Sequence, residues 1–160
     1  MNARDDIRNS LESAQQIAQG YLEDLGEADL LVRPVPQANH IAWQLGHLVE
    51  AEHEMVNAAR PGSMPDLPAG FKEKHTPEAA KLDDPKAFCT KAEYLELWSE
   101  QRAGTLAALD SLTDAELDKP SPVHYVKTIG ALFNMLGVHP LMHVGQWTVV
   151  RRKLGRKLLF

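Results

Sequence analysis

Two histidines four residues apart, His139 and His143, are the residues whose type and spacing point most directly to chemistry. Positions i and i+4 of a helix lie one turn apart on one face, so both imidazoles can donate a nitrogen to a single cation. They fall on the apolar stripe of a predicted helix, where two polar rings need partners and repel each other when protonated. The pair predicts a metal site, and a structural pair of core histidines is the alternative.

A metal site needs at least one ligand beyond this pair. The other histidines of the chain are His40, His47, His53, His75 and His124. His40 and His47 share one flank of a predicted helix with Trp43, and periodicity alone does not choose between them. Glu50 with His53 forms one Glu-x-x-His unit, whereas carboxylate-bridged di-iron bundles use two, and no second unit exists in the sequence.

Apolar residues recur every three or four positions along most of the chain, which indicates helices. We expect a first helix over about residues 7–25, ended near Gly26. A second helix should cover about residues 41–59, capped by Asn39 and stopped by the Pro-Gly pair at residues 61–62.

The second half of the chain carries two capping boxes, each a threonine followed three residues later by a glutamate. Thr90 with Glu93 opens a third helix, and Thr113 with Glu116 opens a single short turn. The last helix should cover about residues 128–154, with a glycine directly after it as the terminator.

These elements predict an all-α four-helix bundle with one extra short helical turn, folded as a single domain over residues 1–160. No stretch alternates with period two for long enough to form a sheet. Residues 61–89 hold five prolines and should form a functional loop or a wall of the bundle. Pro140 inside the last helix predicts a kink or bulge just before the histidine pair, which could re-aim His139.

The composition and net charge of the chain limit the classes of partner that we expect. A net charge of −5 disfavours nucleic acid as a partner, and the basic residues 151–157 are interpreted as cations at a helix C-terminus. No run approaches the roughly 20 apolar residues of a membrane span, and residues 1–13 are polar, so we expect a soluble cytoplasmic protein. The single cysteine, Cys89, rules out an internal disulfide and is interpreted as a small buried hydrophobe.

Two segments of the sequence together resemble the DinB/YfiT-like metalloprotein family, the DinB-like superfamily. They are residues 39–48 (NHIAWQLGHL) and residues 139–146 (HPLMHVGQ). The order of four long helices and a late short turn fits the same family, so the resemblance covers nearly the whole chain. The family takes one metal ligand from Trp-x-x-x-His in the second helix and two from His-x-x-x-His-x-Gly-Gln in the last. When the family's ligand positions are matched to this sequence, the resemblance implies that the ligands are His47, His139 and His143.

The sequence departs from the commonest family pattern at two places. Val144 stands where an arginine is frequent, and Pro140 follows the first ligand of the last helix. Neither change removes a ligand, but both indicate that the pocket differs in shape from those of better-understood relatives. Gln146 and Trp43 are the candidates for orienting the ligands or shaping the site.

The resemblance implies a metal-dependent enzyme. Three neutral imidazoles leave a coordination position for an exogenous ligand, and zinc, nickel and iron(II) all accept this ligand set. Family members include thiol-dependent transferases and isomerases, so we expect an S-transferase that uses a low-molecular-weight thiol on small electrophilic molecules. The alternatives are a metal-dependent hydrolase and a non-catalytic, metal-stapled bundle with a stress or ligand-binding role. No catalytic side chain is assigned.

The family resemblance also implies a homodimer, since relatives often pair through helix faces. Trp98, Trp147 and the apolar chain end, residues 158–160, are the surfaces that such a pairing could cover.

Overall fold

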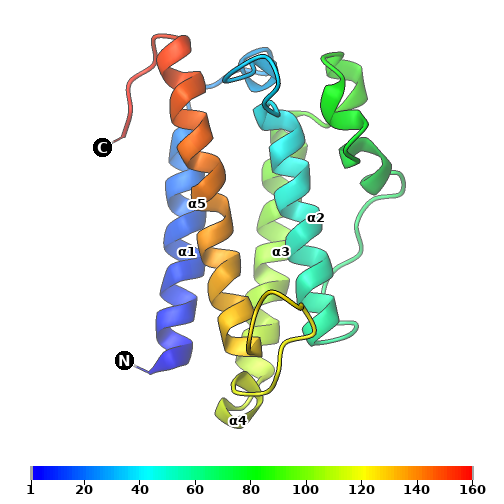
Figure 1. Ribbon diagram of the computed structural model, residues 1–160, viewed down its shortest axis with the longest axis vertical. Helices are drawn as coiled ribbons and strands as arrows, with labels where there is room; N and C mark the ends of the chain where they lie inside the picture. Colours follow the sequence, from blue (N-terminus) through cyan, green and yellow to red (C-terminus); the bar gives the residue numbers. More distant parts are fainter. Residues whose placement is uncertain (1, 160) are drawn as a thin grey trace.

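The computed structural model describes residues 2–159, and within them four long helices pack as a bundle without strands (Figure 1). The long helices are α1 (Ala3–Leu22), α2 (Ile41–Ala59), α3 (Lys91–Ser111) and α5 (Ile129–Lys153). A single turn, α4 (Asp114–Leu117), precedes the last helix, as the sequence predicted. α1 and α5 run side by side in one direction, and α2 and α3 run in the other.

The helix ends follow from the local sequence. Both predicted capping boxes are present, with Glu93 and Glu116 each bonding back to the backbone of its threonine. α5 ends in a Schellman motif in which Gly155 has φ +69° and the next N–H bonds the Arg151 carbonyl at 2.8 Å. The N-cap of α2 is His40 rather than the expected Asn39, because the His40 Nδ1 accepts the hydrogen bond from the Trp43 N–H.

The crossover segment, residues 60–90, is long because α2 and α3 run in parallel, so the chain must return the full length of the bundle. Four short 3₁₀ helices lie outside the long ones: η1 (Asp29–Leu31), η2 (Lys72–His75), η3 (Ala79–Lys81) and η4 (Pro85–Ala87). The last three belong to the crossover, which packs along α2 (Figure 1). The ring of His75 lies so close to Gly46 that a Cβ there would overlap it. The crossover is therefore a wall of the bundle.

The core consists of two apolar clusters with a polar layer where they meet. One cluster holds Trp98 and Trp147, and the other holds Phe133. Between them Glu52 accepts hydrogen bonds from Trp98 Nε1 at 3.2 Å and from Arg102 Nη2 at 3.0 Å, all of them buried. Such a buried pair is costly to break, because either charge alone would be left without a partner.

Two expectations about surface and core are wrong. Trp98 and Trp147 are fully buried in the monomer and offer no surface for a second copy. Cys89 is only half-buried, because it lies at the end of the crossover and faces a cavity.

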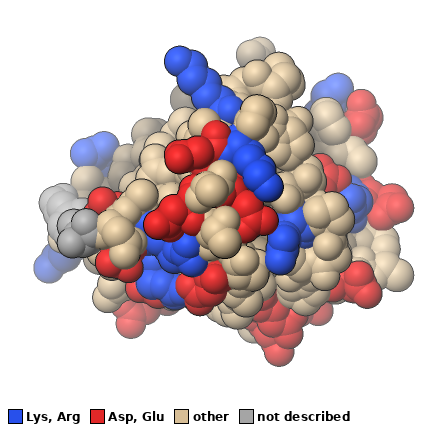
Figure 2. All heavy atoms as spheres, turned by 90° about the horizontal axis from the view of Figure 1, so that it is seen from below, with Lys and Arg blue, Asp and Glu red and all other residues tan. Residues whose placement is uncertain are grey.

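Within residues 2–159, no helix has the length and apolar character that a bilayer crossing requires. Acidic and basic side chains are intermingled on the lower end of the bundle (Figure 2).

Candidate metal centre

Three histidines from two helices, α2 and α5, meet where these helices pack together. His47 comes from α2, and His139 and His143 come from successive turns of α5. One nitrogen from each ring lies within 4.8 Å of the other two, and this is the group of potential metal ligands found within residues 2–159. All three side chains are half-buried, so the site lies at the edge of the core and remains open to solvent.

The α5 pair is already spaced for chelation. The Nε2 atoms of His139 and His143 are 3.2 Å apart. Two zinc–nitrogen bonds of ordinary length at a tetrahedral angle place their nitrogens about 3.3 Å apart. The ring centroid of His47 lies 5.1 Å from that of His139 and 5.4 Å from that of His143. The residues present therefore fit a single metal ion.

The environment keeps these imidazoles neutral, which metal coordination requires. Burial, together with the smaller effects of the neighbouring His139 and His47, lowers the pKa of His143 to about 3. Burial likewise lowers the pKa of His139 to about 4, and it lowers the pKa of His47. The nitrogens thus carry free lone pairs at neutral pH.

Gln44 fixes the tautomer of His143. Its Oε1 accepts a hydrogen bond from Trp147 Nε1 at 2.8 Å and lies 3.0 Å from His143 Nδ1. Because the indole N–H can only donate, this atom is the amide oxygen, and the His143 Nδ1 must donate to it. The His143 Nε2 is then left with a lone pair directed at the site.

The other half of the Gln44 amide is also bound. Its Nε2 donates to the Asn39 carbonyl at 2.6 Å and to Gln146 Oε1 at 3.1 Å. Gln146 therefore contacts Gln44 rather than a histidine. Gln44 could not be predicted as a site residue, because a glutamine within an amphipathic helix is ordinarily solvent-exposed. Its position one turn before Leu48 gives no signal without the tertiary contact to Trp147.

Trp43 packs against His47. Its ring stacks on the His47 ring with centroids 5.2 Å apart and an interplanar angle of 4°. The Trp43 Nε1 donates to the Thr76 carbonyl at 3.0 Å, which ties the indole to the crossover. Trp43 thus limits the rotation of His47.

The remaining histidines lie away from the triad. His40 bonds the Trp43 N–H and the Leu82 carbonyl, so its ring is used in capping α2 and holding the crossover. His53 bonds Gln101, and His75 bonds Tyr94 and the Phe71 carbonyl. Of the two candidates on α2 that periodicity left open, the structure brings His47 to the α5 pair.

Pro140 does not interrupt the helix that carries the pair. α5 is continuous from Ile129 to Lys153 with Pro140 inside it, and the expected kink or bulge before the histidines stays a prediction. Proline removes the N–H that would bond the Leu136 carbonyl, and Arg102 Nη2 of α3 approaches that oxygen at 3.4 Å instead. A donor from a neighbouring helix partly replaces the missing bond, and the helix continues through His139 and His143.

The fold and the site together define a class of protein, the four-helix bundle with a three-histidine group between two of its helices. The family model of the DinB superfamily matches residues 10–147, which include all three histidines. The chain therefore belongs to the DinB superfamily. No curated protein matches it.

Proposed function

We propose that this protein is a metal-dependent enzyme that uses a low-molecular-weight thiol as the nucleophile on a small electrophilic substrate. The observation that carries the proposal is the half-buried, solvent-facing group of His47, His139 and His143. Within residues 2–159 no fourth histidine, cysteine or carboxylate joins the group, which favours an open site over a closed structural one. A divalent ion held there supplies Lewis acidity, which lowers the pKa of a bound thiol.

The chain itself offers no thiol at this site. Its single cysteine, Cys89, lines a cavity against α3, and none of the three histidines lines that cavity. Burial raises the pKa of the Cys89 thiol, so it is a poor nucleophile at neutral pH. An S-transferase built on this fold would have to take its nucleophile from solution.

The protein's own residues would hold and orient the ligands. Gln44 keeps the His143 Nδ1 protonated and its Nε2 free, while Trp43 restrains the His47 ring. The apolar residues Val138 and Met142 are exposed on α5, on the turns that also carry the two histidines. A substrate with an apolar portion would find contact area on these turns.

Cobalt(II) substitution tests the proposal. Thiolate coordination to cobalt gives an intense near-ultraviolet charge-transfer band, so titration with cysteine or glutathione should produce one. Serine and the serine analogue of glutathione, which replace sulfur by oxygen, should not. His139→Ala protein should give no band with any of them. If cobalt binds but no thiol changes its spectrum, S-transfer is wrong, and a hydrolase or a metal-stapled bundle becomes the better reading.

A further inference from the structure

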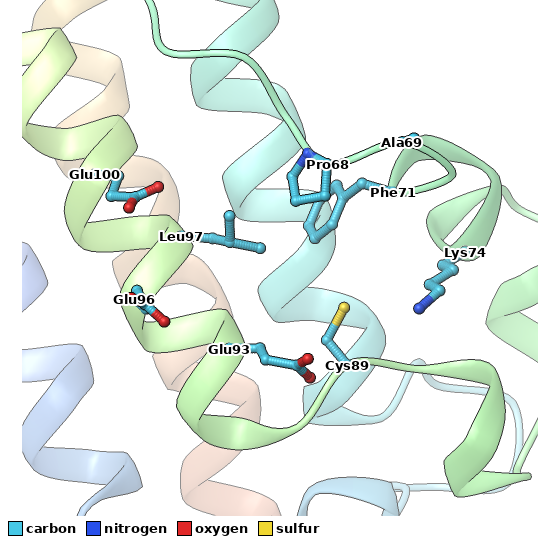
Figure 3. A pocket seen from close by; sticks show the side chains of 9 residues that line it. All are labelled: Pro68, Ala69, Phe71, Lys74, Cys89, Glu93, Glu96, Leu97 and Glu100. Atoms are coloured by element: carbon cyan, nitrogen blue, oxygen red, sulfur yellow. The ribbon is translucent and has the colours of Figure 1, made fainter.

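A cavity of about 280 Å³ lies between α3 and the crossover segment (Figure 3). Its apolar walls are Pro68 and Phe71 from the crossover and Leu97 from α3. Small-molecule pockets range from about 300 to 1,000 Å³, so this cavity suits an occupant smaller than a typical drug.

The inner wall of the cavity is held by hydrogen bonds. The His75 Nδ1 donates to the Phe71 carbonyl at 2.7 Å, since a carbonyl can only accept. The His75 Nε2 then accepts the Tyr94 hydroxyl proton at 2.7 Å, and the same hydroxyl oxygen accepts the Cys89 N–H at 3.3 Å. These hydrogen bonds hold Phe71 and Cys89, which line the cavity, and none of the three histidines of the metal centre lines it.

The charges around the cavity are unbalanced. Glu93, Glu96 and Glu100 line it from α3, and Lys74 faces them from the crossover (Figure 3). Lys74 interacts electrostatically with Glu93, whose carboxylate also caps α3. Within the described residues, Glu96 and Glu100 have no ion pair or hydrogen bond. They stand four residues apart on one helix face, where like charges destabilise a helix.

We propose that this cavity binds a small amphipathic cation, an ammonium group carried on an aromatic or branched aliphatic body. The body packs against Phe71, Pro68 and Leu97, and the ammonium group reaches Glu96 and Glu100. Three carboxylates against one lysine disfavour an anion of the same size. This site is independent of the proposed thiol chemistry.

Cys89 provides a built-in reporter for the test. It is the only cysteine of the chain, and its sulfur points into the cavity (Figure 3). Alkylation by uncharged iodoacetamide should therefore slow when the cavity is filled. Phenethylammonium, 2-phenylethanol and phenylacetate share one aromatic body and differ in charge. Phenethylammonium should protect Cys89 in a saturable manner at about three- to tenfold lower concentration than the alcohol, and phenylacetate should not protect it.

Paired variants test the carboxylates. The double variant Glu96→Gln/Glu100→Gln should weaken phenethylammonium by about three- to tenfold and leave the alcohol unchanged. The control Glu12→Gln/Glu23→Gln removes two negative charges elsewhere, one within α1 and one at its C-cap, and should change neither. Since Cys89 is half-buried and its alkylation is expected to be slow, amide chemical shifts of Ala69, Phe71 and Leu97 provide a readout that does not depend on thiol reactivity.

Three results would overturn the proposal. The first is that no probe slows alkylation or moves those amide shifts. The second is that all three probes act equally, which would show a cavity without charge recognition. The third is wild-type affinity for phenethylammonium in the Glu96→Gln/Glu100→Gln variant.

Discussion

Replacing Gln44 by leucine should weaken metal binding without abolishing the fold. The substitution keeps a similar side-chain volume but removes the oxygen that accepts from His143 Nδ1 and Trp147 Nε1. Loss of an orienting partner of a histidine ligand typically costs 10- to 100-fold in metal affinity, or about 1.4–2.7 kcal/mol. The buried Trp147 N–H loses its acceptor as well, which should lower the free energy of unfolding by about 1–3 kcal/mol.

The assay is competition for zinc or cobalt against a chromophoric chelator, with urea unfolding measured on the metal-free protein. Trp147→Phe is the matched control, because it removes the other donor to Gln44 and leaves the His143 bond in place. It should lower the free energy of unfolding while metal affinity stays within about threefold of wild type.

Two outcomes would refute the role assigned to Gln44. Wild-type metal affinity in Gln44→Leu would show that its oxygen does not orient His143. An equal loss of affinity in Trp147→Phe would show that general loosening of the bundle, rather than the lost hydrogen bond, weakens binding.

Two further predictions concern the stability of the fold, and a third concerns the oligomeric state. Gly46→Ala should lower the free energy of unfolding by about 1–3 kcal/mol in urea titrations, because the new Cβ overlaps a His75 ring held by two hydrogen bonds. Helix propensity alone would instead raise the stability, so a gain in stability would contradict this prediction. Burial lowers the pKa of His75 to about 4. Between pH 6.5 and 4 the His75 ring is therefore neutral in the folded protein but protonated in the unfolded chain. The free energy of unfolding should fall as the pH drops from 6.5 toward 4. His75→Phe should remove up to about 3 kcal/mol of that pH dependence in urea titrations at pH 7 and 4.5, and an unchanged slope would reject the assignment. The expected homodimer stays a prediction. Trp98 and Trp147 are buried, whereas Leu159 of the apolar chain end is exposed and Phe160 lies outside the described residues, so the dimer surface is assigned to Leu159 and the exposed apolar residues of α5. Leu141→Asp/Val149→Asp, at exposed α5 residues other than the two proposed to contact substrate, should then give a monomer by light scattering where wild type gives a dimer, and a monomeric wild type would reject the idea.

Local patterns were sufficient to predict the helices. Caps are encoded by residues three positions apart, so the boxes at Thr90 and Thr113 located two helix starts without tertiary information. Glu52 lies one turn from Leu48 and Val56 on the buried side of α2, where a carboxylate needs a partner. That partner, Arg102, is remote in sequence, and only the packing of α2 against α3 identifies it.

The candidate site was predictable only in part. Helical spacing brought His139 and His143 together, because that contact lies within one helix. The choice of His47 over His40 depended on family resemblance, since both lie on one flank of α2. The Gln44 contacts and the Trp43 stack depend on how α5 and the crossover meet α2, which no local pattern encodes.

Metal content of purified variants tests the central claim most directly. Elemental analysis of wild-type protein should find about one divalent ion per chain. His47→Ala, His139→Ala and His143→Ala should each lose it, while His40→Ala, whose ring caps α2, should retain it. Retention of the ion by both His139→Ala and His143→Ala, or its absence from wild-type protein reconstituted with zinc, nickel or iron(II), would contradict the account.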